Sequence, residues 1–524
     1  MENVVSRKVN SAKSIAFAMI SNIVNIILQF LLRSVFIYVL GVQYLGLKSI
    51  FAGILNILSL SELGVSTAVA FNLYKPVSEN DTQKINSILN IYKKLYLIVG
   101  MVIFFVGVAI IPFLHYIVTD ITDVNVDITL AYLLTLFATV SPYFFAYRNV
   151  LFTVYQHKYK ESIVTTLTNL LSLLAQTLVV LLFKDYYAYL IACFILVVLS
   201  DCVLYTYSRK IYKNIRPANA LPLDNETKVS LKNNIKGMVL HKISYAVLQG
   251  ADSVIISAFI STLILGIYSN YTSFTNAILL VFSIISTSIL GSVGNLIVEG
   301  DTEKSYKVFK YLRFAFFWLA GFCSISLFCL INPTITLWSI FSGWDLSVNW
   351  TFDTFTVFII VANFYLNSSR IITSNFRTAI GMFDKDKWKG LIEAILNIVF
   401  SLLLVKPLGL AGILLGTILS VGCMSLIVDP YMVYKYHFKR PLKSHFCYIF
   451  VYTIVVALVG GLTFFLCSLL PGEGVWNFVF KALTCLVVPN LCFLLLSFRT
   501  KEFKNLVAII KSFFKRKNKD SIQE

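Results

Sequence analysis

Charged residues are scarce in this sequence. They make up 13% of its 524 residues, whereas 58% of the residues are hydrophobic. Acids are scarcer than bases, with 26 Asp and Glu against 44 Lys and Arg. The mean hydropathy is +0.79, and no soluble core could bury that much apolar surface. The composition therefore excludes a soluble protein and indicates a polytopic membrane protein.

The sequence also lacks the residue patterns of catalysis and metal binding. Its 9 cysteines are spread singly, with no CxxC and no Cys/His spacing, so we expect neither a metal site nor a disulfide framework. The 5 histidines form no catalytic set, and no Walker loop for ATP is present. These absences predict a protein that is not an enzyme, has no catalytic residues and uses no cofactor.

Apolar stretches long enough to cross about 30 Å of hydrocarbon occur fourteen times. We expect each of them to form a transmembrane helix, which makes the fold all-α. Their approximate limits are 14–40, 46–72, 92–114, 128–155, 161–183, 187–207, 235–260, 264–297, 309–331, 352–380, 388–405, 408–434, 446–470 and 476–498.

Positive charge alternates between successive loops. Most Lys and Arg fall on the side of the N-terminus, whereas the opposite loops hold Lys184 and Lys406 together with several acids. Because positive charge accumulates on the cytoplasmic side, we expect both termini in the cytoplasm. The formal net charge of +18 then reflects topology and contact with membrane lipids, and no nucleic-acid partner is expected.

Two stretches resemble each other and indicate an internal repeat. Residues 29–47 read QFLLRSVFIYVLGVQYLGL, and residues 249–269 read QGADSVIISAFISTLILGIYS. When they are aligned without gaps, their first glutamines coincide, and Gly46 falls on Gly266. Each copy opens one half of the chain, as in transporters that are built from repeats with a polar site between the halves.

The repeat and the loop lengths predict five segments. The longest cytoplasmic connection is rich in Lys, Arg, Asn and Pro and separates two lobes of six spans. The predicted segments are an N-terminal lobe at 1–207, a cytoplasmic linker at 208–234, a C-terminal lobe at 235–440, two additional spans at 441–498 and a basic amphipathic cytoplasmic tail at 499–524.

Four charged residues, Arg33, Glu62, Asp252 and Arg370, lie deep inside predicted spans. A charge at the centre of a transmembrane helix costs about 2.5 to 3.5 kcal/mol on insertion scales, so these residues should not face lipid. One interpretation is static ion pairing, such as Arg33 with Asp252 or Glu62. The other is a hydrated cavity whose arginines bind an anionic substrate while an acid couples transport to H⁺ or Na⁺.

Uncharged polar residues extend the same helix faces at helical spacing. Such stripes can be ordinary packing contacts between helices, but charges at their centres favour a cavity. The candidate substrate-binding residues are therefore Arg33, Arg370, Gln29, Gln249, Asn25 and Asn367, and the candidates for ion coupling or ion pairing are Asp252 and Glu62.

Three stretches carry a resemblance to a known family. RSVFIYVLGVQYLGL at 33–47, LSLSELGVSTAVA at 58–70 and ADSVIISAFISTLILGIYS at 251–269 resemble the Wzx-type polysaccharide (oligosaccharide-lipid) flippases of the multidrug/oligosaccharidyl-lipid/polysaccharide exporter superfamily. The resemblance covers the whole chain. It implies two six-helix lobes that alternate access to a V-shaped cavity.

The resemblance also implies a substrate, undecaprenyl-diphosphate carrying an oligosaccharide repeat unit. The flippase would move it from the cytoplasmic to the outer leaflet for assembly of capsule, O-antigen or exopolysaccharide. Arg33 and Arg370 would meet the diphosphate or acidic sugars, and Asp252 would be structural or coupling. Implied partners are the lipid-linked oligosaccharide, membrane lipids, and, as candidates, a polysaccharide polymerase and other assembly proteins.

Three other functions remain open at this point. A lipid II flippase of peptidoglycan synthesis shares the lipid diphosphate, but its first span should be more densely cationic. A cation-coupled multidrug exporter of the same superfamily should have a cavity dominated by acids. An integral glycosyltransferase or polymerase should have large loops with catalytic acids, and the loops of this chain are short.

Overall fold

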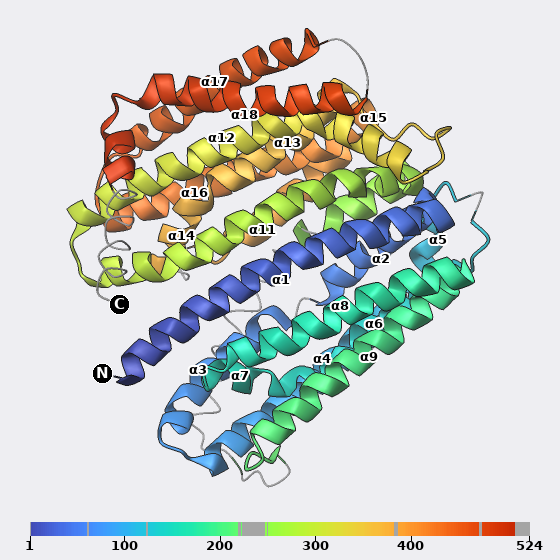
Figure 1. Ribbon diagram of the computed structural model, residues 1–524. Helices are drawn as coiled ribbons and strands as arrows, with labels where there is room; N and C mark the ends of the chain where they lie inside the picture. The colour runs from blue at the N-terminus through green and yellow to red at the C-terminus, as the bar shows by residue number, and fades with distance from the viewer. Residues whose placement is uncertain are drawn as a thin grey trace. The chain divides into compact units, whose positions relative to one another are not determined.

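The computed structural model describes residues 2–59, 62–121, 124–217, 222, 247–248, 250–381, 386–470 and 474–508. These residues form helices and short connections, with no strand among them, which confirms the predicted all-α fold (Figure 1). The elements are α1 (Glu2–Leu40), α2 (Val42–Leu58), α3 (Glu62–Ser78), α4 (Thr82–Ile110), η2 (Ile111–Phe113), α5 (Leu114–Ile117), α6 (Ile128–Val140), η3 (Ser141–Phe144), η4 (Ala146–Arg148), α7 (Val150–Val154), α8 (Lys158–Phe183), α9 (Tyr186–Ile211), α11 (Thr262–Val298), α12 (Thr302–Phe341), α13 (Thr354–Ser369), α14 (Ile371–Ile380), α15 (Lys389–Cys423), α16 (Ser425–Met432), η7 (Val433–Phe438), α17 (Lys443–Ser468) and α18 (Val475–Ser497).

Ten helical segments in the described part of the chain are long and apolar enough to cross a membrane. Two shorter apolar helices, Val42–Leu58 and Gly250–Phe259, add to them. The chain is therefore a multi-pass membrane protein. The count of fourteen spans stays a prediction, because some predicted spans are interrupted and others merge. The predicted span 46–72, for example, is divided between α2 and α3.

Two predicted spans, 388–405 and 408–434, merge at a kink inside α15. Pro407 lies within this helix, and Gly409 has a φ of 56° and a ψ of −132° there. Proline has no N–H to donate to the preceding turn, and glycine adopts a positive φ without steric cost. The kink thus falls at the predicted boundary between the two spans.

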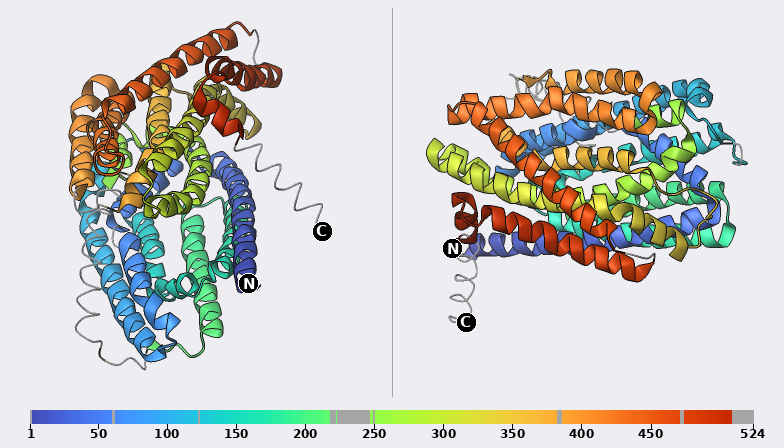
Figure 2. Two further views of the ribbon diagram at one scale, coloured as in Figure 1. Left: turned by 90° about the vertical axis from the view of Figure 1, so that its left-hand side faces the viewer. Right: turned by 90° about the horizontal axis from the view of Figure 1, so that it is seen from above.

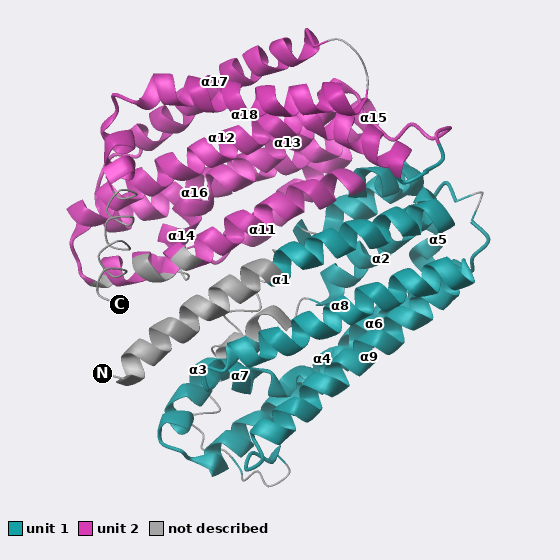
Figure 3. Cartoon of the chain, in the orientation of Figure 1, with its two compact units in different colours: residues 1–269, 342–345 teal, residues 270–341, 346–524 magenta. Residues whose placement is uncertain are grey.

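Contacts divide the chain into two compact units (Figure 3). Unit 1 consists of residues 1–269 and 342–345, and unit 2 of residues 270–341 and 346–524. In unit 1, α8 packs against α1 and α9, and in unit 2, α12 packs against α13, α17 and α18 (Figures 1 and 2). The predicted lobe boundaries stay predictions, since most of the linker lies outside the described residues.

Two glycines that coincide in the repeat alignment meet in unit 1. A Cβ on Gly46 would lie 2.0 Å from the carbonyl oxygen of Thr262, and a Cβ on Gly266 would lie 2.4 Å from that of Val42. The contact is reciprocal, because 266 − 46 and 262 − 42 both equal 220. Such reciprocity is expected at an approximate twofold axis. The contact therefore supports the repeat alignment, and only glycine permits this approach of the backbones.

Hydrogen bonds fix the start of α11 against the end of α5 within unit 1. The backbone N–H of Thr262 donates to the carbonyl of Thr119 at 3.2 Å, and the Thr119 hydroxyl donates to the carbonyl of Ser257 at 2.6 Å. The Ser261 hydroxyl donates to the Asp120 carboxylate at 2.6 Å. These bonds hold the first turns of α11, which carry Ser269 to the site described below.

The described beginning of the predicted tail is helical and packs on α12. Residues 501–508 form the helix, the ring of Phe503 stacks on Trp318 with centroids 5.9 Å apart, and Lys310 lies 3.7 Å from Glu502. The rest of the tail, 509–524, lies outside the described residues.

Candidate functional site

Arg33 lies on α1 in unit 1, seven residues before the helix ends at Leu40, which is roughly 10 Å along the axis. Its Nη2 donates to the Ser269 hydroxyl at 2.5 Å, and that hydroxyl donates to the carbonyl of Gly266 at 2.6 Å. Asn25 is half-buried and Gln29 is exposed on the turns that precede Arg33. The structure thus joins the two copies of the repeat through the predicted arginine.

Lys48 is a second cation in this region, and sequence reasoning missed it. Its Nζ donates to the Tyr189 hydroxyl at 2.7 Å and lies 5.2 Å from the centre of that ring and 5.6 Å from the centre of Phe36. Arg33 is close enough for the two positive charges to interact. The salt bridges among the described residues do not involve Lys48.

The position of Lys48 explains why it was missed. The predicted span began at residue 46, which put Lys48 at the membrane surface, where a lysine needs no explanation. The helix begins instead at Val42, because Gly41 has a φ of 101° and separates it from α1. Lys48 therefore lies six residues inside α2. Gly41 is the residue in the sequence that could have indicated a helix start at Val42, before the predicted start at residue 46.

Aromatic rings surround Lys48 on the side of α9. Phe36 packs edge-on against Tyr189 with centroids 5.0 Å apart, and Tyr44 lies 5.0 Å from Tyr186. Phe36, Tyr186 and Tyr189 are each at most 2% exposed, whereas Lys48 itself is exposed. A lysine ammonium that lies over aromatic rings keeps its charge, while the rings pack against its aliphatic chain. We call the rings of Phe36, Tyr44, Tyr186 and Tyr189 the aromatic wall.

Arg370 lies in unit 2 at the junction of α13 and α14. Its Nη2 donates to the side-chain oxygen of Asn367 at 3.0 Å, and the Asn367 amide donates to the side-chain oxygen of Asn363 at 2.7 Å. The predicted polar stripe is therefore a continuous hydrogen-bonded chain. Arg370 also lines a cavity of about 20 Å³ within unit 2, which is room for one water molecule or a small ion.

Arg313 lines the same cavity, and it too was missed by sequence reasoning, because it falls at the beginning of the predicted span 309–331 and was counted with the cytoplasmic positive charges. It lies eleven residues inside α12 and is 6% exposed. Its Nη1 donates to the Tyr434 hydroxyl at 3.2 Å and to Nδ1 of His445 at 3.1 Å. Its guanidinium lies 3.5 Å from the centre of the Tyr448 ring.

Neutral groups therefore hold both arginines of this cavity. The salt bridges among the described residues involve neither Arg313 nor Arg370. Among the described residues, Glu393 accepts a hydrogen bond of 2.6 Å from Ser425 of the lining, and the charge of Glu502 is close enough to influence Tyr448. Because a buried arginine keeps its charge, the two arginines bring positive charge to the cavity lining.

Other buried cations have partners that explain them without a ligand. Arg377 donates to both carboxylate oxygens of Asp386 at 2.6 and 2.5 Å, and Lys389 lies 2.5 Å from Asp429. Arg148 is 2% exposed and donates to the Ser208 hydroxyl in α9 and to the backbone carbonyls of Tyr212 and Ile215 just beyond the end of that helix. These contacts are structural.

The two candidate coupling residues, Asp252 and Glu62, and the candidate substrate-binding residue Gln249 are only partly described by the structure. Asp252 is half-buried on the helix Gly250–Phe259, and its charge is close enough to influence Tyr268. Gln249 and the side chain of Glu62 lie outside the described residues. The roles of these three residues therefore stay predictions.

The chain is similar to a known protein family and to several solved structures. The family described as "Polysaccharide biosynthesis protein" matches residues 11–290, which is more than half of the 524 residues. The chain belongs to this family. No curated protein sequence matches the chain.

Solved structures share the fold at low sequence identity. The lipid II flippase MurJ in an inward closed conformation has a TM-score of 0.66 at 15% identity, with coverage of 91% of this chain and 98% of that chain. An inward-facing multidrug resistance MATE family transporter of the MOP superfamily has a TM-score of 0.59 at 13% identity, with coverage of 78% and 94%. A MOP superfamily transporter from Pyrococcus furiosus, described as having a binding pocket of reversed polarity, has a TM-score of 0.54 at 14% identity, with coverage of 82% and 97%.

These matches confirm the recognition of the Wzx-type flippases and their superfamily. The solved structures named above are a flippase and transporters, and this chain shares their fold. A lipid-linked substrate and membrane lipids fit a member of this family.

Proposed function

We propose that the chain is a flippase for undecaprenyl-diphosphate-linked oligosaccharide repeat units. It moves them from the cytoplasmic to the outer leaflet of the bacterial cell membrane, with both of its termini in the cytoplasm, and thereby supplies surface polysaccharide assembly. The observation that carries the proposal is the set of cations held inside the helices by hydroxyls, amides and rings: Lys48, Arg313 and Arg370.

The chemistry of these cations suits a lipid diphosphate. A charge inside a transmembrane segment is costly unless another charge compensates it. The planar guanidinium of arginine takes two phosphate oxygens at once, and lysine adds a point charge. In unit 1, Arg33 and Lys48 lie close enough for their charges to interact, so a diphosphate bound there would relieve their repulsion.

The aromatic wall around Lys48 suits the sugar part of the substrate. Tyr44 is half-buried and is held against the buried Tyr186 ring at 5.0 Å, so its accessible part offers an apolar face next to a hydroxyl group, which suits ligands with one apolar and one polar face. Alternating access would then carry the bound head group across, while the lipid tail stays in the membrane. In this cycle Asp252 is the residue for coupling to H⁺ or Na⁺.

Lipid II transport is the second candidate, because the similarity to MurJ covers 91% of this chain. Both candidate substrates carry a lipid diphosphate, so the cationic residues do not separate them. A cation exporter is disfavoured, since Lys48, Arg313 and Arg370 would repel its substrate.

A transport assay separates these functions. The purified full-length chain in vesicles is tested with a fluorescent undecaprenyl-diphosphate oligosaccharide, with lipid II and with a cationic dye. The proposal expects movement of the oligosaccharide lipid at least ten times faster than in empty vesicles, and no dye uptake. Movement of lipid II alone would establish the second candidate, and dye transport alone would contradict both.

A further inference from the structure

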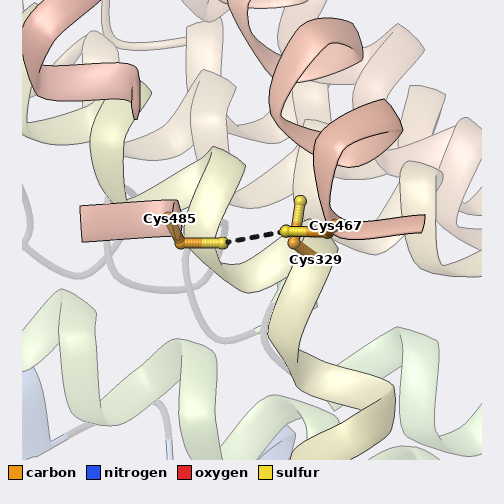
Figure 4. Close-up of side chains that lie close together, drawn as sticks. All are labelled: Cys329, Cys467 and Cys485. Carbon is orange, nitrogen blue, oxygen red and sulfur yellow. Dashed lines mark hydrogen bonds between the residues drawn. The ribbon is translucent and has the colours of Figure 1, made fainter. Parts of the chain in front are cut away.

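Three cysteine side chains meet in unit 2, although they lie far apart in the sequence. Cys329 of α12, Cys467 of α17 and Cys485 of α18 have sulfur atoms that all lie within 4.8 Å of one another. Figure 4 shows the three side chains, with the sulfurs of Cys467 and Cys485 3.9 Å apart. Their exposed fractions are 7%, 4% and 1%. The same three helices hold six of the 9 cysteines: Cys323, Cys329, Cys447, Cys467, Cys485 and Cys492.

The spacing of the sulfurs matches a three-coordinate metal ion. Thiolate sulfurs bind zinc-sized ions at about 2.3 Å, and three of them in a plane around one ion are then about 4.0 Å apart. The observed 3.9 Å between Cys467 and Cys485 is close to that value. A disulfide would instead need the two sulfurs at about 2.05 Å.

The surroundings limit which ion can bind. Ile325, Val459 and Phe493 pack around the cysteines, and no histidine or carboxylate of the described residues joins the group. Hard ions such as Ca²⁺ and Mg²⁺ need oxygen ligands, and structural Zn²⁺ sites have four ligands. Soft sulfur ligands in low number select ions of the Cu(I) type.

Charge balance points to a monovalent ion. A site in apolar surroundings is least costly when the bound complex is neutral. One monovalent cation that displaces one thiol proton to water leaves a neutral complex of one thiolate and two thiols. A divalent ion would have to displace two protons for the same result.

We propose that Cys329, Cys467 and Cys485 form a three-coordinate binding site for a soft monovalent cation of the Cu(I) class. The bound ion links α17 and α18 to α12 through metal–sulfur bonds. It therefore stabilises the attachment of the two C-terminal helices. The site is separate from the cationic residues of the proposed transport function and does not depend on that function.

A competition titration tests the site directly. The purified full-length chain, in detergent under anaerobic reducing conditions, is titrated with Cu(I) against a coloured Cu(I) chelator. We expect one Cu(I) retained per chain, a raised thermal unfolding midpoint, and about three sulfurs at about 2.3 Å by X-ray absorption. Cys329→Ser, Cys467→Ser and Cys485→Ser should each lower the affinity at least tenfold.

Two matched variants serve as controls. Cys447→Ser changes an exposed cysteine on the same helix α17, and Cys193→Ser changes a half-buried cysteine in α9; both should bind Cu(I) as the unmodified chain does. Where a serine variant unfolds, the alanine variant of the same position is measured instead. No retention of Cu(I), equal loss in Cys447→Ser, or thiol counts that show Cys467 and Cys485 oxidised to each other would overturn the proposal.

Discussion

Two groups of buried or half-buried cations in unit 2 differ in what holds them. Arg377 and Lys389 contact the carboxylates of Asp386 and Asp429. Arg313 is held by the Tyr434 hydroxyl, by His445 and by two rings, those of Phe309 and Tyr448. Arg370 is held by the amide of Asn367. The first group is neutralised within the fold, whereas the second keeps a positive charge that another anion can compensate.

The partner of a cation indicates whether its charge is structural or functional better than the depth of the cation in the helix bundle does. A buried cation with its acid is part of the packing, because breaking such a pair leaves an uncompensated charge. A cation whose partners are uncharged side chains keeps a charge that a ligand can compensate. Lys48 of unit 1 is exposed but belongs to this second kind, since it is held by the Tyr189 hydroxyl and by rings.

The largest expected effect comes from breaking an acid-paired cation. Arg377→Ala leaves the Asp386 carboxylate, whose side chain is 1% exposed, without its main partner, and such losses typically cost about 3 to 5 kcal/mol of unfolding free energy. We expect little protein in the membrane and a lowered thermal unfolding midpoint. The double variant Arg377→Ala, Asp386→Ala should recover part of the loss; a normal midpoint in Arg377→Ala would break the comparison.

Arg148 provides an intermediate case, because it is a buried cation whose partners are carbonyls. Removing it should free the backbone that follows α9, and we expect a cost of about 1 to 3 kcal/mol, the range for leaving buried acceptors unsatisfied. Arg148→Ala should lower the thermal unfolding midpoint, while transport per folded molecule stays normal. Loss of transport at normal stability would place Arg148 with the ligand-binding cations instead.

Substitution of Arg313 should lower transport, whereas substitution of Arg148 should lower stability. Arg313→Lys keeps the charge but loses the planar fork, so we expect partial transport, and Arg313→Ala should lower transport about tenfold, which corresponds to about 1.4 kcal/mol. Transport is measured in vesicles that contain equal amounts of folded protein. Tyr434→Phe removes one hydrogen-bond partner of Arg313 and leaves the charge, so it serves as the matched control and should keep most of the transport.

The smallest effect is expected at an exposed charge. The Thr356 hydroxyl and backbone N–H donate to Asp353 at the start of α13 and lower the pKa of its carboxyl from the ordinary 3.8. Since the folded pKa is the lower one, the contribution to stability is present above pH 3.8 and is lost as the pH falls through the folded pKa. Asp353→Asn should remove this acid step from the unfolding midpoint and change little at pH 7; an unchanged acid step would contradict the assignment.

The sequence allowed prediction of the features that depend on local pattern. Long apolar stretches predicted the helices, and helical spacing predicted the polar stripe that includes Asn367 and Arg370. The repeat alignment paired Gly46 with Gly266, and the structure adds that the two glycines are in contact. Each of these follows from periodicity or from repetition along the chain.

Features that depend on helix boundaries or distant partners were missed. Lys48 and Arg313 were assigned to span ends because hydropathy does not locate the first residue of a helix well. In the structure α2 begins six residues before Lys48, and α12 begins eleven residues before Arg313. The three cysteines have no local spacing, since α12, α17 and α18 bring them together only by tertiary packing.

The most direct test of the central claim is the transport rate of Lys48→Ala. Its matched control is Lys75→Ala, which changes an exposed lysine paired with Glu79, and Lys48→Arg keeps the charge. With a fluorescent undecaprenyl-diphosphate oligosaccharide in vesicles, we predict at least a tenfold loss for Lys48→Ala, partial transport for Lys48→Arg and an unchanged rate for Lys75→Ala. A normal rate for Lys48→Ala at normal abundance would contradict the claim that helix cations held by uncharged partners bind the anionic head group.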